Sequence, residues 1–344
     1  MNLDSDMQTV IDQYAKFDAP PLETLTPENA RNNPTLKNAV EEMASESATV
    51  RTMNVAMPTM PEPVGKISHV LILGAKGGEI LARVFTPKGD GPFPVIVYFH
   101  GGGWVIANLD VYEPSCRALC NAAEAIVVSV AYRQAPEHKY PAAAEDAYAA
   151  VQWTMANAGS LGGDPSCVAV AGESAGGNLA TVSCLMARDN GGQMPIAQLL
   201  VYPVTDAGMN TPSYRENANA KPLNAAMMKW FWNLYLENAS QGREAYASPM
   251  MAQSLQGLPP AIVITAENDP LRDEGEAYAK RLADEGVSVD FKRFDGVTHE
   301  FFGLAGAVSK AKEALKLATD GLKKVFDARK GGGAATTRTT STAS

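Results

Sequence analysis

A serine flanked by small residues is the first group in this sequence that could carry out chemistry. Gly-Glu-Ser-Ala-Gly at 172–176 follows an apolar run at 167–171 and precedes a stretch compatible with a helix. A strand, a sharp turn and a helix would expose the Ser174 hydroxyl as a nucleophile, and so tight a turn leaves almost no room for side chains two residues away. The pattern also occurs by chance in turns, so the rest of the chain must decide.

A serine nucleophile needs a general base, and histidine titrates near neutral pH without special tuning. The chain has four histidines, His69, His100, His138 and His299. In a parallel sheet with this kind of turn, the chain order is serine, acid, histidine. Only His299 follows Ser174, just past the last predicted strand, where a loop can reach the carboxyl edge of the sheet. We therefore predict His299 as the base.

The acid that orients this histidine should lie in the loop after the strand predicted at 261–265. That loop offers four carboxylates, Glu267, Asp269, Asp273 and Glu274. Pro270 prevents a helix from starting early and so keeps Asp269 in the loop. Asp273 is better explained as the cap of a helix that begins near Glu274. We predict that Asp269 orients and electrostatically supports His299.

Consecutive glycines after the strand predicted at 94–99 could stabilise negative charge. In His-Gly-Gly-Gly-Trp at 100–104, the missing Cβ atoms let backbone N–H groups approach a substrate. We predict that Gly102, Gly103 and the N–H of Ala175 form an oxyanion hole. A glycine-rich turn can also hold phosphate, but no Lys-Ser/Thr continuation follows here, which argues against a P-loop.

Eight short β-type runs must position these groups. The first two, 66–73 and 78–85, are separated by a Gly-Gly turn and predict an antiparallel pair. The later runs are continuously apolar and alternate with helical stretches, which indicates a mostly parallel, doubly wound α/β sheet of eight strands flanked by helices. Those strands are predicted at 94–99, 125–130, 167–171, 196–201, 261–265 and 287–291, with helices including 142–157, 177–188, 274–285 and 308–327.

Two segments interrupt this alternation. Residues 1–50 carry an apolar stripe at helical spacing without strands, and residues 203–245 contain a helix that is apolar nearly all round. We predict that both form a helical cap over a core made of residues 51–202 and 246–328. The low-complexity end, 329–344, is predicted to be a flexible tail without a role in function.

The cap insertion also suggests walls for a substrate pocket. Met227 and Trp230 lie on its apolar helix, and Trp104 follows the glycines of the predicted oxyanion hole. We expect these three residues to line the pocket. Plain core packing explains aromatic and methionine stripes equally well, so both interpretations stay open at this point.

Composition narrows the class of function. The 344 residues are 46% hydrophobic and 19% charged, as in an ordinary globular protein, and the net charge of −9 argues against nucleic acid or anionic membranes as partners. No run approaches the roughly 20 apolar residues of a membrane span, and no signal peptide is recognisable, so we expect a cytoplasmic location. The four cysteines lack further ligands at zinc-site spacing, so we expect free thiols and no metal.

Four ordered motifs resemble those of the bacterial hormone-sensitive-lipase-like carboxylesterases, a family of the α/β-hydrolase fold. They are His-Gly-Gly-Gly-Trp at 100–104, Tyr-Arg-Gln-Ala-Pro-Glu-His at 132–138, Gly-Glu-Ser-Ala-Gly-Gly at 172–177 and Asp-Pro-Leu-Arg-Asp-Glu-Gly at 269–275. The resemblance implies a Ser174, Asp269, His299 triad, an oxyanion hole at Gly102, Gly103 and Ala175, and a helical cap. It also implies cleavage of short to medium acyl esters without a cofactor, and a homodimer formed through an edge strand.

Three positions depart from the usual pattern of that family. Glu173 stands where aspartate is common, Gln134 where leucine is common, and Glu300 where glycine often follows the histidine. None of these changes removes a catalytic group. Because Glu173 and Glu300 flank catalytic residues, they bear on the local electrostatics and on the pH optimum.

Three functions fit these motifs. The leading prediction is a carboxylic-ester hydrolase in which Ser174 attacks the acyl carbonyl, His299 moves the proton and water releases the acid from an acyl-enzyme. Hydrolases of amides, lactones or carbamates share this chemistry, and nothing in the sequence separates them from ester hydrolases. A non-catalytic small-molecule receptor on the same fold, similar to the plant gibberellin receptors, would lack the catalytic histidine, whereas His299 is present.

Overall fold

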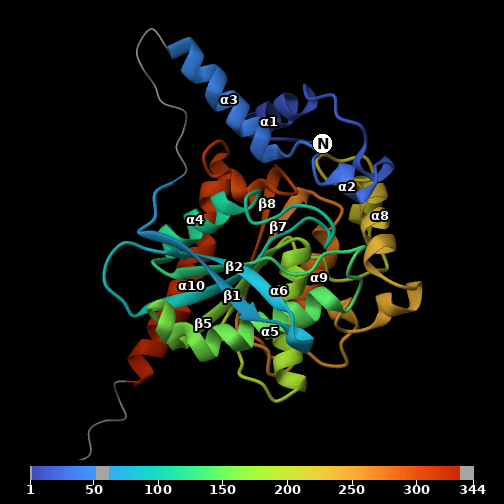
Figure 1. Ribbon diagram of the computed structural model, residues 1–344. Helices are drawn as coiled ribbons and strands as arrows, with labels where there is room; N and C mark the ends of the chain where they lie inside the picture. The colour runs from blue at the N-terminus through green and yellow to red at the C-terminus, as the bar shows by residue number, and fades with distance from the viewer. Residues whose placement is uncertain (1, 52–61, 334–344) are drawn as a thin grey trace, which may run out of the picture.

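An eight-stranded sheet forms the centre of the computed structural model, which describes residues 2–51 and 62–333 (Figure 1). The strands are β1 (Lys66–Leu73), β2 (Glu79–Thr86), β3 (Phe93–Phe99), β4 (Ile126–Val130), β5 (Gly163–Glu173), β6 (Gln198–Val201), β7 (Ala261–Asn268) and β8 (Val289–Thr298). Their order in the sheet is β1-β2-β4-β3-β5-β6-β7-β8. The β1–β2 and β2–β4 pairs are antiparallel, and all other neighbours are parallel. The predicted mostly parallel α/β sheet is therefore confirmed.

Helices cover both faces of this sheet (Figure 1). They are α1 (Ser5–Ala15), α2 (Pro27–Ala30), α3 (Leu36–Arg51), α4 (Glu113–Ala123), α5 (Ala142–Asn157), α6 (Ala175–Asp189), α7 (Pro212–Glu216), α8 (Ala225–Tyr235), α9 (Arg272–Asp284) and α10 (Ser309–Gly333). Six short 3₁₀ turns are η1 (Leu22–Thr24), η2 (Ala75–Gly77), η3 (Ala158–Leu161), η4 (Ala239–Arg243), η5 (Pro249–Met251) and η6 (Phe301–Leu304). The helix predicted at 142–157 matches α5 at both ends.

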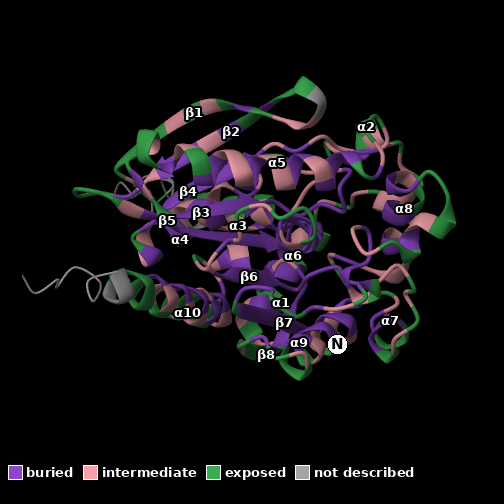
Figure 2. Cartoon of the chain, turned by 90° about the horizontal axis from the view of Figure 1, so that it is seen from below, coloured by how far each residue is buried: buried purple, intermediate pink, exposed green. Residues whose placement is uncertain are grey.

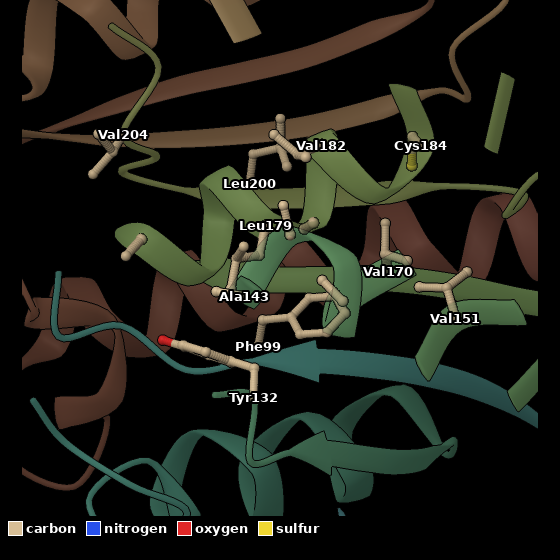
Figure 3. Packing of buried hydrophobic residues seen from close by; sticks show 14 of the residues in the cluster. Phe99, Tyr132, Ala143, Val151, Val170, Leu179, Val182, Cys184, Leu200 and Val204 are labelled. Carbon is tan, nitrogen blue, oxygen red and sulfur yellow. The ribbon is translucent and has the colours of Figure 1, made fainter. Parts of the chain in front are cut away.

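Successive side chains of a strand point to opposite faces of the sheet, which divides the hydrophobic core into two layers. In β3, Val97 and Phe99 pack with α5 and α6, whereas Ile96 and Tyr98 pack with α4 and α10 on the opposite face. Figure 3 shows Phe99 in the first layer, next to side chains of β5 and α6. Almost all of α6 is buried (Figure 2). The helix that follows the predicted nucleophile is therefore fixed rigidly against the sheet, which favours precise placement of that residue.

The N-terminal segment crosses the molecule at the carboxyl end of β7 and β8 (Figure 1). The N–H of Asp4 donates to the carbonyl of Gly296 at 2.8 Å, and the Asn268 amide donates to the carbonyl of Asn2 at 3.2 Å. Further along, Arg31 donates to the carbonyls of Val105 and Ala135. These bonds attach the segment to the loops in which the sequence places the catalytic groups.

The C-terminal helix is longer than expected. Its predicted end lies near residue 328, but α10 continues to Gly333, so residues 329–333 are helical rather than part of a tail. A helix can extend past its last apolar contact, because each added residue continues an existing hydrogen-bond ladder. The rest of the predicted tail, 334–344, lies outside the described residues, as do residues 52–61 beside the predicted boundary between cap and core.

The described ranges contain no helix of the length and apolar character needed to cross a membrane. The four cysteines, Cys116, Cys120, Cys167 and Cys184, are buried as free thiols in the structure. Burial raises the pKa of the Cys120 thiol to about 12, so this group stays protonated and unreactive at neutral pH.

Candidate active site

The turn between β5 and α6 holds Ser174 in a strained backbone conformation, with φ 58° and ψ −121°. Glycine is required on both sides of it. A Cβ on Gly172 would lie 2.1 Å from the carbonyl oxygen of Gly176, and a Cβ on Gly176 would lie 1.9 Å from that of Phe99. The structure therefore gives the steric reason for both glycines, and the strain is of the kind that persists at functional sites.

Two hydrogen bonds bring the three predicted catalytic residues together. The Oγ of Ser174 lies 3.0 Å from Nε2 of His299, and Nδ1 of the same histidine lies 2.6 Å from Oδ2 of Asp269. The side chains come from the ends of β5, β8 and β7, and all three are buried. Because parallel strands share one carboxyl edge, residues 125 positions apart in sequence meet there.

Asp269 is fixed by its own loop. Its Oδ1 accepts a hydrogen bond from the N–H of Leu271 at 2.8 Å, which leaves Oδ2 for His299. Helix α9 begins at Arg272, directly after this turn, so Asp273 lies inside the first turn of the helix. The predicted role of Asp273 as the cap of this helix is therefore wrong. Asp273 instead accepts a hydrogen bond from the N–H of Ser213 and pairs with Arg272.

The predicted oxyanion glycines adopt backbone conformations that favour glycine. Gly102 has φ +98° and Gly103 has φ +58°. A Cβ on Gly102 would lie 2.2 Å from the carbonyl oxygen of Ile106, and one on Gly103 would lie 2.2 Å from the ring of Phe231. Ala175 is the first residue of α6, where a backbone N–H has no partner within the helix. This arrangement can supply N–H donors to a developing oxyanion.

Three carboxylates surround the histidine and set its charge. Burial alone lowers the pKa of His299, but the carboxylate of Asp269, helped by those of Glu300 and Glu173, outweighs it, so the pKa is raised above 6.5. Glu173 is buried and accepts hydrogen bonds from the hydroxyls of Tyr98 and Tyr202. Burial raises the pKa of Glu173 and of Glu300 above 4.5.

These charges lead to a prediction about pH. A protonated His299 cannot accept the serine proton, so kcat/KM should rise with pH through an apparent pKa above 6.5 and reach a plateau at alkaline pH. Glu300→Gln should move that apparent pKa downward, because it removes a negative charge that favours the imidazolium ion. Initial rates from pH 5 to 9 measure both values, and a flat profile from pH 5 to 8 would count against His299 as the base.

A cavity of about 210 Å³ lies beside Gly102, one of the predicted oxyanion glycines. Gly102, Met227 and Glu300 contribute to its wall, as do Tyr14, Arg31, Asn33, Thr35 and Asn38 of the N-terminal segment. Met227 thus lines this cavity, and its expected place in a substrate pocket stays a prediction. The residues of the N-terminal segment were missed individually, because nothing in their spacing indicates which of them face the site.

The other two expected pocket residues pack against aromatic rings. The side chain of Trp104 has no exposed surface and stacks on Tyr235, with ring centroids 4.1 Å apart. The expectation that Trp104 lines the pocket is therefore wrong: its ring lies in the core against α8, where the rings of Tyr235 and Trp232 fill the space beside it. Trp230 is half-buried and packs edge-to-face on Phe231.

Comparison with known proteins finds similarity to α/β hydrolases. The model of a family with the alpha/beta hydrolase fold matches residues 96–303. Carboxylesterase NlhH of Mycobacterium tuberculosis is 44% identical over 254 residues, which cover 73% of this chain and 80% of that protein. An ethyl acetate hydrolase of Pseudomonas putida is 33% identical over 75% of this chain and 82% of its own. A crystallised esterase of Pyrobaculum calidifontis has a TM-score of 0.81 at 38% identity, covering 94% of this chain and 99% of that one.

Proposed function

Because this chain belongs to the bacterial hormone-sensitive-lipase-like carboxylesterase family of the α/β-hydrolase fold, we propose that it hydrolyses carboxylic esters. The observation that carries this proposal is the pair of hydrogen bonds linking Ser174, His299 and Asp269. Gly102, one of the predicted oxyanion donors, and Glu300, which follows His299, both line a cavity that could admit part of a substrate. Relatives that match most of the chain are named for ester hydrolysis.

The reaction divides into two acyl transfers. The Ser174 oxygen attacks the ester carbonyl while Nε2 of His299 takes the hydroxyl proton, and the new oxyanion accepts N–H bonds from Gly102, Gly103 and Ala175. The intermediate then collapses, and the same proton passes from His299 to the departing alcohol. A water molecule repeats the sequence on the acyl-enzyme and releases the acid. Asp269 holds the Nδ1–H of the histidine throughout and stabilises the imidazolium ion.

The proposal has four further parts: the cap, the absence of a cofactor, the location and the homodimer. The N-terminal segment and residues 203–245 act as the cap over the site, since residues of both line the cavity beside Gly102. No cofactor takes part, because protein groups and water supply every step. Buried free thiols favour work in the cytoplasm. The expected homodimer stays a prediction, for which β1 and β8 are the two sheet edges.

A series of p-nitrophenyl esters from acetate to palmitate tests the proposal. The modest cavity volume favours short to medium acyl chains, so kcat/KM should peak there and decline toward palmitate. The p-nitroanilides of the same acids separate esterase from amidase activity. Hydrolysis of the anilides but not of the esters would contradict the proposed function.

Covalent labelling identifies the nucleophile independently of turnover. A p-nitrophenyl alkylphosphonate should add one phosphonyl group to the chain, and peptide mass spectrometry should find it on Ser174, the residue that Nε2 of His299 faces. Labelling of another residue would contradict the assigned mechanism even if ester hydrolysis is observed.

A further inference from the structure

We propose that Glu300 determines specificity, because its carboxylate makes the substrate cavity reject esters that carry a negative charge near the reacting carbonyl. This inference rests on the proposed ester hydrolysis and adds a substrate class to it. Esters with neutral or cationic groups in this cavity are then the substrates, and half-esters of dicarboxylic acids are poor ones.

Glu300 lies just past the end of β8 and in the wall of the cavity. It directly follows His299 and adopts a left-handed conformation, with φ 64°, which turns the chain at the end of β8. Glu300 and Gly102 line the same cavity, so Glu300 shares this space with one of the predicted oxyanion donors. An ester group that enters this cavity beside Gly102 therefore shares it with Glu300.

The surroundings leave this negative charge without a cationic partner. Within the described part of the chain, the hydroxyl of Tyr112 is its hydrogen-bond donor, at a long 3.5 Å, and no lysine or arginine pairs with it. Besides Tyr112, the groups whose charges act on Glu300 are His299, Glu173 and Asp269. Two of these three are carboxylates, so the field in this part of the site disfavours a further anion.

Arg31 is the other residue with a charged side chain among those that line the cavity, and its charge is already matched. Its guanidinium group makes two bonds to the carboxylate of Glu137, at 2.8 and 2.6 Å. It also donates to the carbonyls of Val105 and Ala135. Nε, Nη1 and Nη2 of Arg31 thus all donate hydrogen bonds to protein oxygens. These bonds hold the guanidinium group in place, so it is not free to bind a substrate anion.

Two substrate pairs test the proposal on the acyl and alcohol sides. p-Nitrophenyl butyrate and mono-p-nitrophenyl succinate differ on the acyl side by a methyl group against a carboxylate, and phenyl acetate and 4-acetoxybenzoate differ by a carboxylate on the alcohol side. For at least one pair, the wild type should prefer the neutral ester, and Glu300→Gln should reduce this preference in kcat/KM by about tenfold or more. The assays use the alkaline plateau, because high pH favours both the ionised Glu300 carboxyl and the neutral His299.

Two more variants separate the effect of the Glu300 charge from the effects of side-chain shape and of net charge. Glu300→Asp keeps the charge and should keep most of the preference, whereas a purely structural role predicts that it behaves like Glu300→Gln. Glu41→Gln makes the same charge change on α3, at an exposed ion pair with Lys37, and should leave the preference unchanged. Thermal unfolding checks that each variant is folded.

The same assays distinguish a wrong inference about Glu300 from a wrong proposed function. If the wild type hydrolyses the neutral esters but Glu300→Gln changes neither preference by more than twofold, the inference is overturned and the esterase stands. An equal change in Glu41→Gln also overturns it, because the effect is then one of net charge. If the wild type hydrolyses none of the four esters, both fall together.

Discussion

Ser174→Ala is expected to lower kcat for ester hydrolysis by about 10⁶-fold while the protein stays folded. The substitution removes the Oγ that lies 3.0 Å from Nε2 of His299, so the acyl-enzyme cannot form. Alanine keeps the Cβ that this tight turn already accommodates, so we expect little change in stability. Steady-state kinetics with p-nitrophenyl butyrate and a thermal unfolding curve measure the two effects separately.

Ser183 offers a matched control on the same helix. It is also buried, and its hydroxyl donates to the carbonyl of Ala180 at 2.7 Å, away from the three catalytic side chains. Ser183→Ala makes the same chemical change in α6 and should keep kcat within about threefold of the wild type. A folded Ser174→Ala variant that keeps more than a hundredth of the activity would show that another group is the nucleophile.

Local steric requirements explain which parts of the site could be predicted from sequence. Gly172 and Gly176 are needed because a Cβ at either position would overlap backbone atoms, and this constraint acts within a few residues. Chain order then singled out His299 as the histidine after the nucleophile. The sheet followed in the same way, because continuous apolar runs between helices have few alternatives to buried parallel strands.

Tertiary packing decided what the sequence could not. Whether Trp104 faces a pocket or the core depends on Tyr235, which is 131 residues away and fills the space beside it. The start of α9 was misplaced because the Asp269 side chain also bonds to the N–H of Leu271, a local competition that propensity does not resolve. The contacts of Arg31 with the loops around the site link segments about 105 residues apart.

Asp269→Asn is expected to reduce kcat by about 10⁴-fold without unfolding the protein. Oδ2 of Asp269 accepts the Nδ1–H of His299 at 2.6 Å, and this bond fixes the tautomer whose Nε2 can take the serine proton. An asparagine can present its NH₂ group to Nδ1 instead, which places the ring proton on Nε2 and blocks the base. The side-chain oxygen can still accept from the N–H of Leu271, so the loop should keep its shape.

Asp273→Asn is the matched control, because Asp273 lies four residues on and is the acid in this loop that the sequence analysis set aside. Its carboxylate bonds to the N–H of Ser213 and to Arg272, and among the described residues it makes no hydrogen bond to His299. We expect this variant to lose some stability and to keep kcat within about tenfold of the wild type. If Asp273→Asn instead shows the 10⁴-fold loss while Asp269→Asn stays active, Asp273 supports the histidine in solution and the hydrogen bond to Asp269 has no catalytic role.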